Sequence, residues 1–313
     1  ELALSLLEQG ITGMKIWPFD IAAERTGGFD ISPAELRAAL EPFAKIRKAV
    51  GNRMDIMVEF HSLWSLPMAK KLAQALAEFG TYWHEDPFRL DNIGDLADYA
   101  RHSKAWVCAS ETLAYTHSFR EYLETGVAGV AMLDLSWCGG ITEARKIAGM
   151  AEAWHVPVAP HDCTGPVVYT ASCHLSLHAK NALVQESVRA FYTGWYNELA
   201  VGLPVVRNGE VSIGDAPGLG IELMPEVETQ ARLTHAPVLQ RTAARVRVRT
   251  CREKLSVKRE LLVGCGSNHG KRLTCDGTSA WECLTTLDYN ADHKPDVVWD
   301  LHELPLPFPE NHF

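Results

Sequence analysis

The stretch "IMVEFHSLW" (residues 56–64) reads as a buried strand that ends in a carboxylate and an imidazole. Side chains on a strand alternate between its two faces, so Glu59 and His61 are expected to point the same way. A strand that simply runs out into solvent would give the same pattern. What decides between these interpretations is whether other strands of the chain end in the same way.

Strand-like and helical segments alternate along residues 1–226. Residues 33–50 and 140–154 have the 3–4 spacing of helices, as does "PMAKKLAQALAEFG". The strand-like segments are "TGMKIWPF", "DIMVEF", "TYWHEDPF", "AWVCASET", "GVAMLDLS", "VPVAPHD" and "ALVQESV". Alternation of strand and helix predicts an α/β fold with a parallel sheet. Seven such units favour a TIM-like (β/α) barrel over an open sheet.

Polar residues recur where these strands are expected to end. They are Lys15, Glu59, Glu85, Glu111, Asp134, His161 and Glu186. From the first glutamate onward they follow one another at intervals of about 25 residues, the length of one strand–helix unit. The carboxyl ends of the strands of a parallel barrel meet on one rim, where active sites are built. Glu59 is therefore interpreted as one member of a ring of polar side chains.

Three members of this ring, Glu59, Glu85 and Glu111, are carboxylates on neighbouring strands. They would repel one another unless a cation lay between them, and hard oxygen ligands suit Mg²⁺. The alternative is three unrelated, solvated glutamates at the starts of loops. Spacing alone leaves both interpretations open.

The motifs resemble the enolase superfamily, in its mandelate racemase/muconate lactonizing enzyme-like branch. The resemblance covers about residues 1–224 and rests on segments in family order: "MKIWPFD", "MVEFHSLW", "YWHEDPF", "CASETL", "MLDLSWCGGITEARKIAGMAEAWHVPVAPHD" and "LVQES". It implies a barrel of the enolase C-terminal type, with Mg²⁺ held by Glu59, Glu85 and Glu111. Many relatives have Asp at the first position, so Glu59 is a departure. Asp86 is an alternative ligand, although the order of residues in "WHEDP" favours Glu85.

The resemblance also assigns acid–base groups. It implies that His161, oriented by Asp134, exchanges a proton with the carbon next to a substrate carboxylate, and that Glu186 contacts that carboxylate. Four further histidines have no such support and are interpreted as structural: His102, His117, His174 and His178.

A second group of residues bears on whether the reaction is a racemisation or a dehydration. Lys15 matches the first lysine of the Lys-x-Lys motif of many relatives, but Trp17 replaces the second, so a two-base racemisation lacks one base. His61 matches a histidine with which relatives that dehydrate sugar acids protonate the departing hydroxyl. The resemblance thus implies dehydration of a small sugar acid to a 2-keto-3-deoxy acid. A racemase or epimerase is the alternative.

Relatives also carry an amino-terminal capping domain, and the intact ones are expected to form homo-oligomers. Because this chain starts in a helix before "MKIWPFD", we expect the cap and the first barrel strand to be absent. The sequence therefore predicts an incomplete barrel, derived from a lyase but impaired in activity.

A different composition begins near residue 226. Residues 227–257 are predicted to be a basic linker, and residues 258–313 resemble the first part of a class I S-adenosylmethionine-dependent methyltransferase. This resemblance implies a partial Rossmann-like fragment that binds S-adenosylmethionine through Gly264, Gly266, Asp288 and Asp300. The alternatives are a fragment without a ligand and an inactive fusion of two gene fragments.

Composition excludes some classes of protein. The net charge of −9 argues against general nucleic-acid binding. No apolar run reaches the roughly 20 residues that a membrane span needs. The eight cysteines are scattered without a Cys-x-x-Cys pair, which is typical of a reducing, cytoplasmic compartment.

Overall fold

A computed structural model of the chain describes residues 1–227 with their side chains, and residues 260–263, 284–288 and 297–298 as backbone. The chain divides into two units, Glu1–Met224 and Pro225–Phe313, and each is described by itself.

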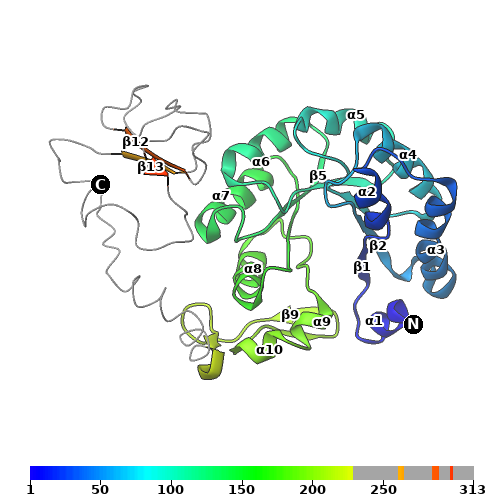
Figure 1. Cartoon of the computed structure of the whole chain (residues 1–313). Coiled ribbons are helices and arrows are strands. Elements are labelled where there is room, and N and C mark those ends of the chain that lie inside the picture. The colour runs from blue at the N-terminus through cyan, green and yellow to red at the C-terminus, as the bar shows by residue number, and fades with distance from the viewer. Residues whose placement is uncertain (228–259, 264–283, 289–296, 299–313) are drawn as a thin grey trace. The chain divides into compact units, whose positions relative to one another are not determined.

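The centre of the first unit is a six-stranded sheet in which every pair of neighbours is parallel. Its strands, in chain and spatial order, are β1 Gly13–Ile16, β2 Asp55–Glu59, β3 Trp83–Glu85, β4 Trp106–Ala109, β5 Ala128–Leu133 and β6 Val158–Pro160. Figure 1 shows this sheet curled, with helices following one another around its outside. This is the predicted α/β fold, in the form of a parallel half-barrel.

Helices precede, connect and follow the strands of the sheet. In chain order they are α1 Leu2–Glu8, α2 Asp20–Thr26, α3 Pro33–Val50, α4 Leu66–Leu76, α5 Leu96–Ala100, α6 Tyr115–Glu124, α7 Gly140–Ala153, α8 Pro166–His178, α9 Arg189–Tyr192 and α10 Tyr196–Leu199. The short 3₁₀ helices are η1 Gly51–Arg53, η2 Ala77–Phe79 and η3 Ile93–Asp95. Helix α3 begins with a capping box, in which Ser32 and Glu35 bond each other's backbone N–H groups. It spans the residues that the sequence predicted.

Alternating side chains of the strands pack into different clusters. Leu133 of β5 belongs to the main core, which includes residues of the surrounding helices, whereas Met132 packs with Trp83 in a cluster made of strand residues. The second cluster therefore lies on the inner face of the curled sheet. Glu85 is two residues after Trp83 on β3 and lies on the same, inner face.

The prediction that "ALVQESV" forms a seventh regular strand was wrong. Within residues 1–227, this segment makes one isolated parallel bridge, between Ala182 and Val158 of β6. The N–H of Glu186 also donates to the carbonyl of Pro160, at 3.3 Å. Pro160 has no N–H of its own with which to extend the ladder, which explains why the pairing stops.

Small antiparallel pairs follow the half-barrel. They are β7 Ala200–Val201 with β10 Glu222–Leu223, and β8 Val205–Arg207 with β9 Glu210–Ser212. None of the helices in the part of the chain that the structure describes has the length and apolar character needed to cross a membrane.

The second unit contains a three-stranded parallel sheet of β11 Glu260–Val263, β12 Leu284–Asp288 and β13 Val297–Val298, in that order. Asp288, a predicted contact of S-adenosylmethionine, is the last residue of β12. The other three predicted contacts, Gly264, Gly266 and Asp300, lie outside the described residues. The methyltransferase resemblance stays a prediction.

Candidate metal centre and active site

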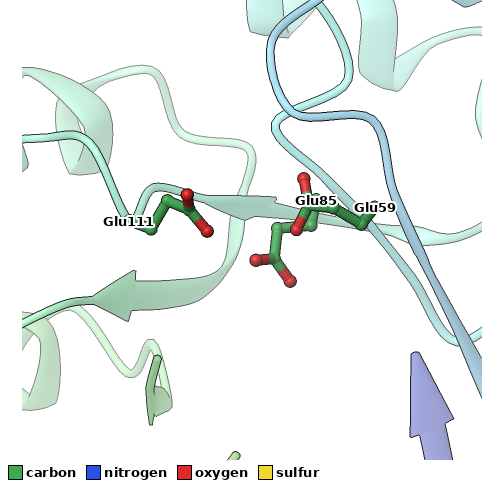
Figure 2. Close-up of side chains that lie close together, drawn as sticks. All are labelled: Glu59, Glu85 and Glu111. Carbon is green, nitrogen blue, oxygen red and sulfur yellow. The ribbon is translucent and has the colours of Figure 1, made fainter. Parts of the chain in front are cut away.

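Three glutamates converge at the carboxyl ends of neighbouring strands. Glu59 ends β2, Glu85 ends β3, and Glu111 lies two residues beyond the end of β4. Glu59 and Glu85 are partners in the pairing of β2 with β3. Each of the three offers a carboxylate oxygen, and these oxygens all lie within 4.8 Å of one another (Figure 2).

The chemistry of this cluster fits a divalent cation. Glu85 is fully buried, Glu59 is 1% exposed, and the side chain of Glu111 is 24% exposed, which leaves one side open to a ligand. Oxygen ligands of an octahedral Mg²⁺ ion lie about 3 Å apart when adjacent and about 4 Å apart when opposite, so the three carboxylates need to approach one another by up to about 2 Å to share the ion. Buried carboxylates that lie this close to one another call for a positive charge between them.

Lys15 of β1 supplies one positive charge. Its Nζ atom lies 2.7 Å from Glu85, 3.1 Å from Glu59 and 2.8 Å from Glu186. Burial works to lower the pKa of Lys15, but the charges of Glu186, Glu85 and Glu59 outweigh it and raise that pKa well above its usual value. Burial, together with the charge of Glu59, raises the pKa of Glu85. The single positive charge of Lys15 does not balance the three carboxylates that it contacts, so negative charge remains around it.

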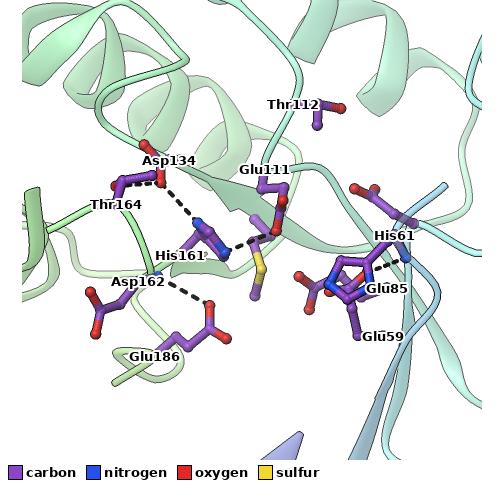
Figure 3. A network of polar contacts seen from close by, with 12 residues as sticks. Glu59, His61, Glu85, Glu111, Thr112, Asp134, His161, Asp162, Thr164 and Glu186 are labelled. Atoms are coloured by element: carbon purple, nitrogen blue, oxygen red, sulfur yellow. Dashed lines mark hydrogen bonds and ion pairs between the residues drawn. The ribbon is translucent and has the colours of Figure 1, made fainter. Parts of the chain in front are cut away.

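A histidine lies beside the cluster. His161 follows β6, and its Nδ1 atom is 2.8 Å from Oδ2 of Asp134, which follows β5. Its Nε2 atom is 2.9 Å from Oε2 of Glu111 (Figure 3). Burial works to lower the pKa of His161, but its hydrogen bonds to Asp134, Cys163 and Glu111 outweigh it and raise that pKa far above its usual value. A carboxylate at each ring nitrogen favours the imidazolium form.

Asp134 is itself fixed in place. The Ser136 N–H donates to its Oδ1 atom at 2.7 Å, and the Thr164 hydroxyl donates to its Oδ2 atom at 3.0 Å. Sequence reasoning missed both partners. An aspartate side chain often accepts a hydrogen bond from the N–H two residues later, so the Ser136 contact could have been found, whereas Thr164 is 30 residues away.

The structure corrects the expected orientation of His61. Strand β2 ends at Glu59, and His61 has a φ of 49°, so the alternation of a strand does not extend to it. Instead, the N–H groups of Phe60 and His61 both donate to Oε1 of Glu59, at 3.0 and 2.7 Å. The backbone turns because it supplies donors to a buried carboxylate. Figure 3 shows His61 and His161 on either side of Glu111.

Two further residues surround His61, and sequence reasoning assigned neither of them to the site. Oδ2 of Asp20, at the start of α2, lies 2.8 Å from Nδ1 of His61. The rings of Trp17 and His61 form a T-shaped pair, with centroids 6.1 Å apart and an interplanar angle of 72°. Both residues belong to the "MKIWPFD" motif, which gave no signal of this contact.

The remaining candidates have other partners. Asp86 is not part of the metal cluster found among the described residues. It accepts a hydrogen bond from the Ser110 hydroxyl at 2.7 Å, and burial raises its pKa to about 8. Glu186 accepts a bond from the N–H of Asp162 at 3.2 Å while its other oxygen contacts Lys15.

Comparisons with known proteins agree with this geometry. A family model described as "Enolase C-terminal domain-like" matches residues 1–227. A protein named D-galactonate dehydratase from Ralstonia nicotianae is 33% identical over 234 residues, which is 68% of this chain and 59% of that protein. A protein of the same name from Ralstonia pickettii is 35% identical over 208 residues, 64% of this chain and 53% of that protein. The chain thus spans less than two thirds of the length of these relatives.

Solved structures are similar as well. The crystal structure of an enolase of the mandelate racemase subgroup from Agrobacterium tumefaciens is 62% identical, with a TM-score of 0.71, and the match covers 73% of this chain and 62% of that one. An enolase from Sargasso Sea environmental sequencing is 47% identical, with a TM-score of 0.70 and coverages of 74% and 62%. The resemblance inferred from the motifs is confirmed for the half-barrel. The chain belongs to the enolase C-terminal domain-like family.

Proposed function

We propose that this site removes the proton next to the carboxylate of a sugar acid and expels the 3-hydroxyl as water, giving a 2-keto-3-deoxy acid. One observation carries the proposal: a cluster of three carboxylates lies beside a histidine–aspartate pair, with a second histidine on the other side of Glu111. The relatives named D-galactonate dehydratase support dehydration of a sugar acid as the reaction class.

Glu59, Glu85 and Glu111 would hold the divalent cation, for which we propose Mg²⁺. When bound, the cation supplies positive charge that stabilises the oxyanion developing on the substrate as its α-proton leaves. We propose that Lys15 and Glu186, which contact each other at 2.8 Å, contact the substrate carboxylate. Lys15 is the positively charged member of this pair, so it is the one that would attract the negatively charged carboxylate of the substrate.

His161 is proposed to accept the proton from C2 at its Nε2 atom. Asp134 holds Nδ1 at 2.8 Å, which fixes the ring and stabilises the imidazolium that forms. In the structure Nε2 contacts Glu111, so His161 can accept a proton once that carboxylate has another partner. The contact between His161 and Glu111 is therefore the arrangement that we propose for the site before substrate binds.

His61 is proposed to protonate the departing hydroxyl. As the C2–H bond breaks, its electrons form a C2–C3 double bond, the C3–O bond breaks, and the hydroxyl leaves as water with the proton of His61. The resulting enol then becomes the 2-keto acid. Trp17 stands where a second lysine would serve a two-base inversion, so we favour dehydration over racemisation.

The test is a screen of six-carbon sugar acids, D-galactonate among them, with the 313-residue chain and Mg²⁺, with 2-keto acid as the readout. We expect product from at least one acid, at the low rate of an impaired enzyme, and a further loss of about 10²-fold or more in Glu111→Gln, because the cation would lose a ligand. Glu121→Gln, which removes an exposed carboxylate on α6, is the matched control and should equal the wild type. The absence of product with every acid, or equal rates in Glu111→Gln and wild type, would contradict the proposal.

A further inference from the structure

The carboxylate of Asp20 contacts the imidazole ring of His61. Its Oδ2 atom lies 2.8 Å from Nδ1 of a residue 41 positions later in the chain. Its other oxygen, Oδ1, is buried and has no hydrogen-bond partner within the described part of the chain. Asp20 caps no helix through its side chain, because the N-cap of α2 is Phe19 and no side-chain cap bond is formed. Within residues 1–227, the one polar contact of its side chain is therefore the imidazole.

The ring of His61 is held at several points. Its backbone N–H donates to Glu59, its Nδ1 atom contacts Asp20, and its ring packs against that of Trp17 in a T-shaped arrangement. No hydrogen bond at its Nε2 atom is recorded among residues 1–227. A ring nitrogen that bonds a carboxylate carries the proton, so the other nitrogen becomes the one that exchanges protons with a ligand.

The chain ties Asp20 to the loop that carries His61. The loop after α2 packs on residues 63–65: the Ser65 N–H donates to the Gly28 carbonyl at 3.0 Å. A Cβ atom on Gly28 would lie 2.0 Å from the carbonyl oxygen of Leu63, so glycine is required for this approach. Arg89 also donates to the carbonyl of Gly27 at 3.0 Å. Both ends of the Asp20–His61 contact thus belong to one packed assembly.

The same construction occurs at the other histidine, where Asp134 lies 2.8 Å from Nδ1 of His161. We propose that Asp20 is the positioning residue of His61: it holds the ring with Nδ1 protonated and Nε2 turned to the substrate, so that Nε2 delivers the proton to the departing 3-hydroxyl. The proton-delivery part rests on the proposed dehydration, whereas the tautomer part does not. The site then has two histidine–carboxylate pairs, one for each proton transfer.

The proton balance of this step is simple. His61 gives its Nε2 proton to the hydroxyl oxygen as the C3–O bond breaks, and one water molecule leaves. The neutral imidazole keeps its Nδ1 proton because Asp20 accepts that hydrogen bond. Solvent then returns a proton to Nε2. Asp20 acts throughout as a hydrogen-bond acceptor and takes up no proton from the substrate.

The first test reads the tautomer directly and needs no substrate. In the full chain with ¹⁵N-labelled histidine, the His61 signals are identified by their loss in His61→Gln. We expect neutral His61 to carry its proton on Nδ1 in wild type and in Glu24→Gln, which removes an exposed carboxylate from the same helix. In Asp20→Ala we expect a shift toward the Nε2–H tautomer. An unchanged tautomer in folded Asp20→Ala would overturn the proposal.

The second test separates the two proton transfers. In D₂O, the turnover of a sugar acid and the wash-in of deuterium at C2 are measured on the same sample. We expect Asp20→Ala to lower kcat for dehydration about 10²-fold, with wash-in and KM nearly unchanged, because His161 still acts at C2. Asp20→Glu should recover part of the loss, and Asp20→Asn serves as an isosteric variant if Asp20→Ala does not fold.

Equal losses of dehydration and wash-in in these variants would contradict a positioning role at His61. If wild type shows no dehydration at all, the proposed function fails, and the tautomer measurement still decides the role of Asp20.

Discussion

The Nζ atom of Lys15 lies 2.7 Å from Oε1 of Glu85, at the point where the three proposed metal ligands converge. The ammonium also contacts Glu59 and so neutralises part of the negative charge that a divalent cation would neutralise. Lys15 and the cation therefore act on the same carboxylates. This overlap leads to a prediction about both stability and metal affinity.

Lys15→Met should lower the stability of the metal-free chain, because removing one partner of a buried ion pair costs about 3–5 kcal/mol. It should also raise the affinity for Mg²⁺, since the repulsion among the carboxylates is then relieved by the cation alone. Thermal unfolding and calorimetric titration measure the two effects. Lys45→Met, at an exposed lysine of α3, is the control. Weaker Mg²⁺ binding in Lys15→Met would show that the ammonium and the cation do not compete.

Mg²⁺ binding should strengthen as the pH rises. Burial and the charge of Glu59 raise the pKa of Glu85, so at low pH Glu85 holds a proton that the metal must displace. The apparent affinity should fall about tenfold for each pH unit below that pKa and level off above it. Titrations in buffers of different ionisation enthalpy would detect the released proton. Binding that releases no proton at any pH would remove Glu85 from the ligand set.

Asp134→Asn should slow the exchange of the C2 proton by about 10²-fold or more, because His161 loses the carboxylate that orients it. Asp134 is fully buried and bonded to Ser136 and Thr164, so an amide there also disturbs these donors. Deuterium wash-in at C2 is the readout. Asp91→Asn, at an exposed position, should behave as wild type. Retention of the wild-type exchange rate in Asp134→Asn would leave His161 without its proposed partner.

Gly28→Ala should damage the site from a distance. Gly28 has a φ of 78° and lies against the Leu63 carbonyl, so an added methyl group must push the loop after α2 away from His61. Gly51→Ala is a matched control, because Gly51 also has a positive φ, of 60°, but nothing lies within 4 Å of its added Cβ. Both should lose about 1 kcal/mol of unfolding free energy from backbone strain, and Gly28→Ala about 1–3 kcal/mol more from the clash. Equal losses would mean that the loop is not held as described.

Much of the half-barrel could be predicted from the sequence, because its signals are local. The 3–4 apolar spacing predicted α3, and the regular spacing of polar strand ends predicted that Glu59, Glu85 and Glu111 share one rim. Parallel pairing makes this convergence automatic, because it places all carboxyl ends at one edge.

The errors have equally physical causes. The expected seventh strand shrank to one bridge because Pro160 lacks a donor. His61 left the strand because the N–H groups of residues 60 and 61 serve the carboxylate of Glu59. The contact between Asp20 and His61 joins segments 41 residues apart, and no local pattern in the sequence encodes such a pairing.

The structure of the product decides whether the site removes water from a sugar acid. The 313-residue chain is incubated with Mg²⁺ and a reactive sugar acid in D₂O, and the product is followed by NMR. We expect a 2-keto-3-deoxy acid that carries one solvent deuterium at C3, with no inverted sugar acid. A product inverted at C2 that keeps its 3-hydroxyl would contradict dehydration and would assign the site to racemisation instead.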